Sequence, residues 1–178
     1  MNNDIERVLI TQDQIKDLLD TMATEITTKY QDQFPLVVSV LTGAMIFTGD
    51  MLKRLNFKLN LDLVDVSSYA GTNTTGRVKL IQDLKSNVQG RTVIIMEDII
   101  DTGLTMNFLV KLLKKRGAKN IAICALLDKP ARRQVDIKGD FIGFETPDEF
   151  LVGYGLDYNN LYRNLPYIGI LKPTVYQK

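Results

Sequence analysis

Histidine and tryptophan are both absent from this sequence of 178 residues. Without histidine, the chain cannot build a Ser-His-Asp or Cys-His arrangement for nucleophilic catalysis, and imidazole ligation of a metal is excluded as well. Any general base must therefore be a residue of another type. Cysteine is nearly absent too: Cys124 stands alone, cannot form an internal disulfide, and lies in the apolar run 121–127. This is the pattern of a buried structural thiol in a reducing compartment.

An excess of either charge is also missing, because 22 Lys and Arg balance 21 Asp and Glu. Bulk binding to nucleic acid or to membranes is therefore not expected. The sequence shows no apolar run of membrane-spanning length and no signal peptide, which predicts a cytoplasmic protein. A hydrophobic fraction of 45% over this length suits one buried core rather than two domains.

The stretch 91–105 carries the strongest local pattern. The apolar residues 93–95 predict a buried strand, and Glu97, Asp98 and Asp101 follow it. Apolar residues then recur at helical spacing from Met106 to Leu113, and Gly117 is placed to end a helix. The segment therefore predicts a strand, an acidic loop and a helix.

Unpaired N–H groups at the start of such a helix attract phosphates. Thr102, Gly103 and Thr105 suit this role, since glycine allows close approach and the hydroxyls donate to phosphate oxygens. The neighbouring carboxylates must then face ribose hydroxyls, a hydrated Mg²⁺ or a proton in transit. The alternative is an acidic loop that only caps the helix.

Two further strands end in short polar segments. The run 36–41 leads into Thr42-Gly43 and a predicted helix over 44–55, and the run 120–127 leads into Asp128-Lys129. Repeated units of this kind imply parallel strands with their loops on one edge. Alone, Thr42-Gly43 would be an ordinary turn and Lys129 a solvated lysine. The long polar segment 67–76 is either a functional loop or a hairpin connection.

The segment 97–103, Glu-Asp-Ile-Ile-Asp-Thr-Gly, resembles the phosphoribosyl-pyrophosphate (PRPP) motif of the type I phosphoribosyltransferases. This motif and other segments between Leu41 and Arg163 are most similar to those of the hypoxanthine-guanine phosphoribosyltransferases. The resemblance implies an α/β fold in which helices flank a central parallel sheet of about five strands. It also implies one domain over 1–178, with a core of about 11–145 and a small hood formed by the N-terminal segment and about 146–178.

The resemblance assigns roles to individual residues. The ribose and 5-phosphate of PRPP would be held by Glu97, Asp98, Asp101, Thr102, Gly103, Leu104 and Thr105. Pyrophosphate would meet Thr42, Gly43 and Arg163, and Ser68-Tyr69 would belong to a loop that closes over the site. Many members carry lysine where this chain has Thr42.

The purine would be bound by Lys129, Phe150, Leu151 and Asp157. Lysine suits a 6-oxo group because an ammonium has donors only, whereas adenine presents an amino group there. By the same resemblance, Asp157, Glu97 and Asp98 would contact Mg²⁺. Without it, Phe150 would be a core residue and Asp157 a turn residue.

The implied reaction is purine salvage. The 5-phosphoribosyl group passes from PRPP to N9 of hypoxanthine or guanine, giving IMP or GMP and pyrophosphate, with Asp101 as general base at N7. The family also suggests a homodimer or homotetramer. A PRPP-sensing regulator that binds nucleic acid is a rival, disfavoured by the near-neutral charge and by Asp101. A Walker-type protein is excluded because no Gly-Lys-Ser/Thr loop occurs.

Overall fold

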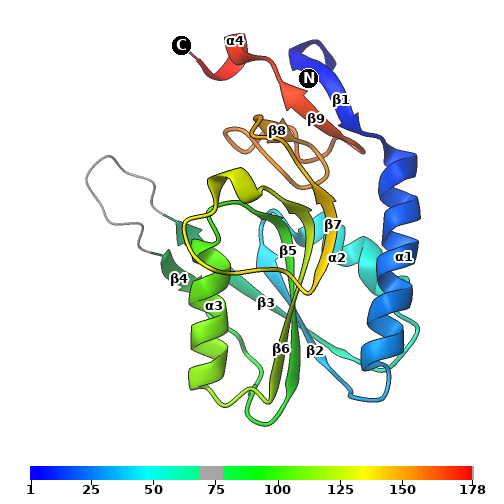
Figure 1. Cartoon of the computed structure of the whole chain (residues 1–178), viewed down its shortest axis with the longest axis vertical. Coiled ribbons are helices and arrows are strands. Elements are labelled where there is room, and N and C mark those ends of the chain that lie inside the picture. The colour runs from blue at the N-terminus through cyan, green and yellow to red at the C-terminus, as the bar shows by residue number, and fades with distance from the viewer. Residues whose placement is uncertain (69–77, 178) are drawn as a thin grey trace.

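The computed structural model describes residues 1–68 and 78–177, and Figure 1 shows how their helices and strands are arranged. Along the chain the elements are η1 (Asn2–Asp4), β1 (Ile5–Ile10), α1 (Gln12–Tyr30), β2 (Leu36–Leu41), α2 (Met45–Leu52), β3 (Asn60–Ser68), β4 (Val78–Gln82), β5 (Thr92–Ile100), α3 (Leu104–Lys115), β6 (Asn120–Asp128), η2 (Pro130–Arg132), β7 (Phe141–Glu145), β8 (Leu151–Val152), β9 (Ile168–Leu171) and α4 (Pro173–Tyr176). Of the two residues predicted in the closing loop, Ser68 ends β3, and Tyr69 lies outside the described residues.

Six of the described strands form one sheet in the order β4-β3-β2-β5-β6-β7. Within it β3, β2, β5, β6 and β7 are parallel, and β4 pairs antiparallel with β3 at one edge. Helices α1 and α2 cover one face of the sheet, and α3 covers the other (Figure 1). The predicted central parallel sheet of about five strands flanked by helices is therefore confirmed.

An apolar layer covers each face of the main sheet, and a third, smaller apolar cluster lies in the segments at the two ends of the chain. On β5, Ile94 and Met96 pack in the layer beneath α1 and α2, whereas Val93 and Ile95 pack in the layer beneath α3. A parallel strand covered on both faces needs such a continuous apolar run, which is why the sequence marks it so clearly.

β5 is longer than predicted. It stays paired with β6 until Ile100 lies opposite Asp128, so Glu97 and Asp98 belong to the strand and not to a loop. The prediction was wrong because acidic residues suggested an end to the strand, whereas backbone pairing with β6 continues regardless of side-chain charge. A rigid strand therefore fixes both carboxylates.

The two long helices begin in different ways. At α1, the Thr11 side chain accepts from the backbone N–H of Gln14 and the Gln14 side chain accepts from that of Thr11, which is the predicted capping box. α3 instead begins after Gly103, at φ 82°, and its N-cap supplies no side-chain acceptor. Apart from the Leu104 amide, which donates to the Thr102 hydroxyl at 3.4 Å, the first N–H groups of α3 therefore remain available to a ligand. None of the described helices combines the length and apolarity needed to cross a bilayer.

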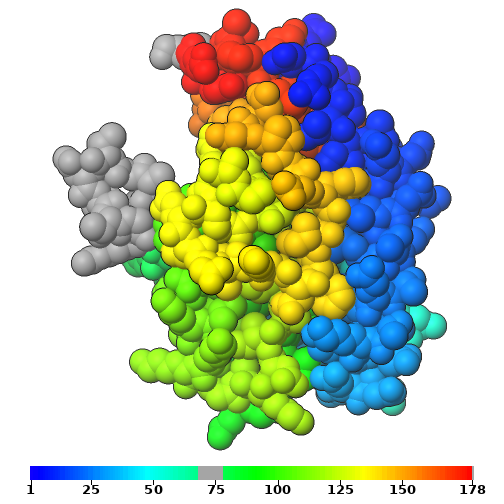
Figure 2. All heavy atoms as spheres, viewed as in Figure 1, coloured from blue at the N-terminus to red at the C-terminus, as the bar shows by residue number. Residues whose placement is uncertain are grey.

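A smaller sheet, in the order β1-β9-β8, lies beyond the carboxyl ends of the parallel strands (Figure 1). We use the term hood for residues 1–10 and 146–177, which contain it. Both ends of the chain lie side by side in the hood, as Figure 2 shows in blue and red. The tail, unremarkable in sequence, forms α4, and its Tyr176 ring stacks on Phe150 with centroids 4.7 Å apart.

Candidate active site

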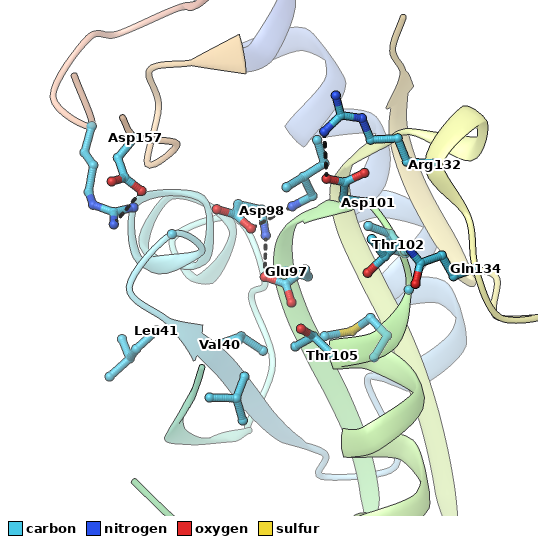
Figure 3. A pocket seen from close by; sticks show the side chains of 17 residues that line it. Val40, Leu41, Glu97, Asp98, Asp101, Thr102, Thr105, Arg132, Gln134 and Asp157 are labelled. Carbon is cyan, nitrogen blue, oxygen red and sulfur yellow. Dashed lines mark hydrogen bonds and ion pairs between the residues drawn. The ribbon is translucent and has the colours of Figure 1, made fainter. Parts of the chain in front are cut away.

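A cavity of about 770 Å³ opens between the carboxyl edge of the main sheet and the hood. It is lined from β2 and the loop after it, from β5 and the start of α3, from the segment after β6, and from the hood. The lining residues are Val40, Leu41, Gly43, Val66, Glu97, Asp98, Ile99, Ile100, Asp101, Thr102, Gly103, Thr105, Met106, Arg132, Gln134, Asp157 and Arg163. In Figure 3, Glu97 and Asp98 lie between Asp157 on one side and Asp101 on the other.

Glu97 and Asp98 form a close acidic pair on β5. Burial raises the pKa of Glu97 well above its usual value, and the charge of Asp98 raises it further. Burial also raises the pKa of Asp98, although hydrogen bonding to Glu97 and to the Ile99 amide and the charge of Arg163 partly oppose the rise. Two desolvated carboxylates at one place favour a shared proton or a bound cation.

This acidic pair fits Mg²⁺ as part of a site completed by other oxygens. The described residues contain no group of three or more side chains that could hold a metal by themselves. Mg²⁺ is commonly held by one or two carboxylates together with substrate phosphates and water, so a pair of acids is a sufficient protein contribution.

Asp101 lies just past the end of β5 and faces the same cavity. Its Oδ1 atom is buried and has no hydrogen-bond partner among the described residues, while Oδ2 lies 3.9 Å from Nη1 of Arg132. A buried carboxylate oxygen without a partner costs free energy, and a shift of the side chain toward a donating ligand would remove that cost. The Asp101 side chain as a whole is 37% exposed, so a ligand can reach the carboxylate although Oδ1 itself is buried.

The turn from Thr102 to the start of α3 provides an anion site beside Asp101. At Gly103 a Cβ atom would lie only 2.9 Å from Cδ of Arg133 and 3.1 Å from Cγ2 of Val135, and its φ of 82° disfavours other residues. Thr102 and Thr105 line the cavity, and the Thr102 hydroxyl accepts from the Leu104 amide at 3.4 Å. Amides and hydroxyls at the positive end of a helix suit a phosphate.

The opposite wall of the cavity comes from the loop after β2 and from the hood. Gly43 lies against Asp98, where a Cβ atom would overlap with the carboxylate. The Arg163 guanidinium pairs through Nη2 with Oδ1 of Asp157 at 2.7 Å and donates through Nη1 to the Gly155 carbonyl at 2.6 Å. Thr42, by contrast, is exposed and does not line the cavity.

Lys129 is a buried residue and not the solvated lysine of the alternative interpretation. Its Nζ donates to the carbonyl of Glu149 at 2.8 Å. Burial lowers the pKa of Lys129, and the negative charge of Asp101 partly offsets this effect. The two side chains are therefore close enough for their charges to interact. The ammonium has three donors, so two remain for another acceptor.

A family model for the phosphoribosyl transferase domain matches residues 10–159. The chain belongs to the phosphoribosyltransferase family. The family resemblance expected from the motif at 97–103 is thereby confirmed.

Individual relatives are similar to this phosphoribosyltransferase over its whole length. The hypoxanthine-guanine phosphoribosyltransferase of Bacillus subtilis is 53% identical over 178 residues, which cover 99% of each chain. A bifunctional protein TilS/HprT of Listeria monocytogenes is 52% identical over 179 residues, covering 100% of this chain and 28% of that protein. Among solved structures, a hypoxanthine phosphoribosyltransferase of Staphylococcus aureus superposes with a TM-score of 0.96 at 45% identity, covering 100% of this chain and 97% of that one.

The structure brings most of the predicted site residues of this phosphoribosyltransferase to one cavity. Glu97, Asp98, Asp101, Thr102, Gly103, Thr105, Gly43, Asp157 and Arg163 line it. Thr42, Leu104, Lys129, Phe150 and Leu151 do not. Phe150 stacks on Tyr176 and meets Tyr158 edge to face at 5.5 Å, and Leu151 is buried in β8.

Arg133 is a residue whose importance the sequence did not show, because it is only the second of two neighbouring arginines after a strand. The Arg133 side chain is 16% exposed and forms an ion pair with Asp128. It also donates to the carbonyls of Ile100 at 3.3 Å and Asp101 at 3.2 Å. Arg133 thus holds the backbone at the point where β5 leaves the sheet and Asp101 enters the cavity.

Proposed function

We propose that this phosphoribosyltransferase transfers the 5-phosphoribosyl group of PRPP to N9 of hypoxanthine or guanine and releases pyrophosphate. The observation that carries the proposal is the Asp101 side chain, which lines a cavity that also holds the start of α3 and the acidic pair at 97–98. The names of the Bacillus subtilis and Staphylococcus aureus relatives support the choice of base.

The two walls of the cavity would bind different parts of PRPP. The 5-phosphate would meet the amides at the start of α3 and the hydroxyls of Thr102 and Thr105, and the ribose hydroxyls would lie near Glu97 and Asp98. Pyrophosphate would lie against the Gly43 backbone and the Arg163 guanidinium, which suits paired phosphate oxygens.

The barrier comes from a developing ribosyl cation and a highly charged leaving group. Donors fixed before the reaction on Gly43 and Arg163 would stabilise pyrophosphate as it departs. Bound at Glu97, Asp98 and Asp157, Mg²⁺ would supply further positive charge next to the pyrophosphate. A metal site of this kind is supported by the raised pKa values of the buried pair at 97–98.

Asp101 is the proposed general base. As purine N9 forms its bond to C1 of ribose and the bond to pyrophosphate breaks, N7–H becomes acidic and its proton passes to the Asp101 carboxylate. Lys129 would donate to the 6-oxo group on the same edge of the base, using an ammonium proton not engaged by Glu149. Phe150 would stack on the purine, and Tyr69 and Ser68 would belong to the loop that closes over it.

The proposal is tested by measuring pyrophosphate release with PRPP, Mg²⁺ and each of hypoxanthine, guanine, xanthine and adenine. We expect turnover with hypoxanthine and guanine and a large loss with adenine, because adenine presents donors to the Lys129 ammonium. Equal use of adenine, or no turnover with any base, would contradict the proposal.

We also propose a cytoplasmic location and a homodimeric or homotetrameric assembly. The buried free thiol of Cys124 agrees with a reducing compartment. Exposed apolar side chains at Leu61, Leu63 and Ile81 give one edge of the main sheet a surface that suits self-association. Light scattering on the purified chain would measure the assembly directly, and a monomer at micromolar concentration would reject that part of the proposal.

A further inference from the structure

The hood meets the loop after β2 backbone against backbone, at Gly155 and Gly43. Gly155, at φ 104°, packs so closely on Gly43 that a Cβ atom at Gly155 would overlap with the Gly43 carbonyl oxygen. Close backbone packing of this kind transmits small shifts of one segment to the other, because no flexible side chain lies between them.

The residue before Gly155, Tyr154, forms a hydrogen bond to the helix that follows the same loop. The Tyr154 hydroxyl donates to Oδ2 of Asp50 at 2.7 Å, and the Asp50 carboxylate also pairs through Oδ1 with Lys53 at 2.6 Å. Asp50 lies in α2, which starts two residues after Gly43. The bond therefore joins the hood to the helix that continues directly from the proposed pyrophosphate loop.

Asp50 is a charged acceptor at this link. Burial alone would raise the pKa of Asp50, but hydrogen bonds from Lys53 and Tyr154 and the charges of Lys53 and Arg54 outweigh it and lower that pKa. A hydrogen bond from a buried hydroxyl to an ionised carboxylate is stronger than a bond between neutral groups.

We propose that the Tyr154–Asp50 hydrogen bond sets the position of Gly155 and Arg163 relative to Gly43, and so sets the geometry of pyrophosphate binding and departure. The inference rests on the proposed function. Tyr154 is a positioning residue in this account: it acts through Gly155, whose carbonyl accepts from Arg163 at 2.6 Å, and not by touching substrate.

The effect should be confined to the pyrophosphate half of the site. Asp101 and Lys129 have contacts of their own: Arg133 donates to the Asp101 carbonyl, and Lys129 donates to the carbonyl of Glu149, which lies in the hood but before β8 and outside the segment from Tyr154 to Arg163. Loosening the hood at Tyr154 would therefore disturb Gly43 and Arg163 while leaving Asp101 and Lys129 in place.

The hood contains a matched control for this link. Tyr162 is 6% exposed, as is Tyr154, and its hydroxyl also donates to a carboxylate, Oδ2 of Asp4 at 3.0 Å. Asp4 lies in the hood itself, so the Tyr162 bond does not connect the hood to α2. Tyr162→Phe removes the same chemical group from an equally buried position without changing the link to the pyrophosphate loop.

The experiment compares Tyr154→Phe with Tyr162→Phe in the full chain. For Tyr154→Phe we expect the KM for PRPP, and the dissociation constant for Mg²⁺-pyrophosphate measured by calorimetry, to rise about tenfold, which is the scale of one lost bond to a charged group. The KM for hypoxanthine should change by less than about twofold, and Tyr162→Phe should leave both values near those of the wild type.

Two variants of Asp50 test the same hydrogen bond from the side of its acceptor. Asp50→Asn keeps an oxygen acceptor for Tyr154 and should retain most of the pyrophosphate affinity, whereas Asp50→Ala should reproduce the loss seen with Tyr154→Phe. In Tyr154→Phe/Asp50→Ala the two losses should not add, because both remove one bond.

The outcomes separate this inference from the proposed function. If the wild type releases pyrophosphate with hypoxanthine but Tyr154→Phe matches Tyr162→Phe, or raises the KM for hypoxanthine as much as that for PRPP, the positioning role is wrong and the function stands. If the wild type neither turns over PRPP nor binds pyrophosphate, the proposed function itself has failed.

Discussion

The two walls of the cavity are built in different ways. The wall from Glu97 to Thr105 is one continuous segment, in which a buried strand, a turn and a helix start follow one another without interruption. The opposite wall, which carries Gly43, Asp157 and Arg163, is assembled from segments that meet only because the sheet order and the hood bring them together. Lys129, which lies outside the lining, depends on the fold in the same way because its partner Glu149 is in another segment. The first wall can therefore be predicted from local sequence patterns, whereas the second depends on the whole fold.

This difference predicts different consequences of mutation. Changes in the continuous wall should alter chemistry and leave the fold intact, because β5 is held by backbone pairing with β2 and β6 and α3 by backbone bonds within the helix. Changes in the assembled wall should alter base selection, or the stability of the contacts that hold its pieces together.

The largest expected effect is on the continuous wall, at Asp101. Asp101→Asn removes the proposed base while keeping the side-chain shape, so kcat should fall by about a hundred- to ten-thousandfold with little change in PRPP affinity. Steady-state kinetics and calorimetry with PRPP would measure the two quantities. Turnover at the wild-type rate would reject Asp101 as the base.

The second-largest effect is expected at Arg133, which holds the backbone where β5 leaves the sheet. Arg133→Ala leaves Asp128 without its ion-pair partner and the Asp101 carbonyl without the arginine donor, and the Ile100 carbonyl keeps only the Lys129 amide. This change should lower the free energy of unfolding by roughly 3 kcal/mol. Denaturant unfolding would measure this. Arg132→Ala is the control, since that exposed side chain should cost less than about 1 kcal/mol; equal losses would contradict the role given to Arg133.

A smaller effect is expected at Lys129, which is buried outside the cavity lining. Lys129→Ala should lower kcat/KM for hypoxanthine and guanine by roughly ten- to a hundredfold, because one charged hydrogen bond to the 6-oxo group is lost. Competition assays should show a much smaller change in the binding of adenine. An equal change for both kinds of base would exclude Lys129 from selecting the 6-oxo group.

The smallest effect lies away from both walls, at Asp62. Burial would raise the pKa of Asp62, but hydrogen bonds from Ser86, Leu63 and Lys85 outweigh it and lower that pKa. Because the pKa is lower in the folded than in the unfolded state, the stabilisation is present at neutral pH and is lost as the pH falls through the folded-state value.

Asp62→Asn should therefore cost about 1–2 kcal/mol at pH 7 and progressively less in acid, without changing turnover. Thermal unfolding across this pH range would measure it, with the exposed Asp136→Asn as the control. A cost that stays constant with pH would show that charge at Asp62 is not responsible.

The same contrast explains which features the sequence could predict. The parallel sheet, the capping box at Thr11 and the segment 97–105 follow from apolar runs, glycine placement and local spacing, which act over a few residues. The extension of β5 through Glu97 and Asp98 was missed because pairing with β6 decides where the strand ends.

The missed contacts are those between distant segments. Nothing near Arg133 in the sequence shows that the end of β5 presents carbonyls to it. The bond from Tyr154 to Asp50 joins residues 104 positions apart. Likewise, the stacking of Phe150 on Tyr176 depends on how the tail folds back over the hood. Such contacts exist only after the topology is formed.

The central claim is that both walls act on one phosphoribosyl group, and the most direct measurement is the product balance with PRPP and hypoxanthine. The purified chain should form IMP and pyrophosphate in equal amounts in the presence of Mg²⁺, and chelating the metal should stop both. Pyrophosphate formed without IMP would mean that the cavity hydrolyses PRPP and does not present a purine to it, which would contradict the account.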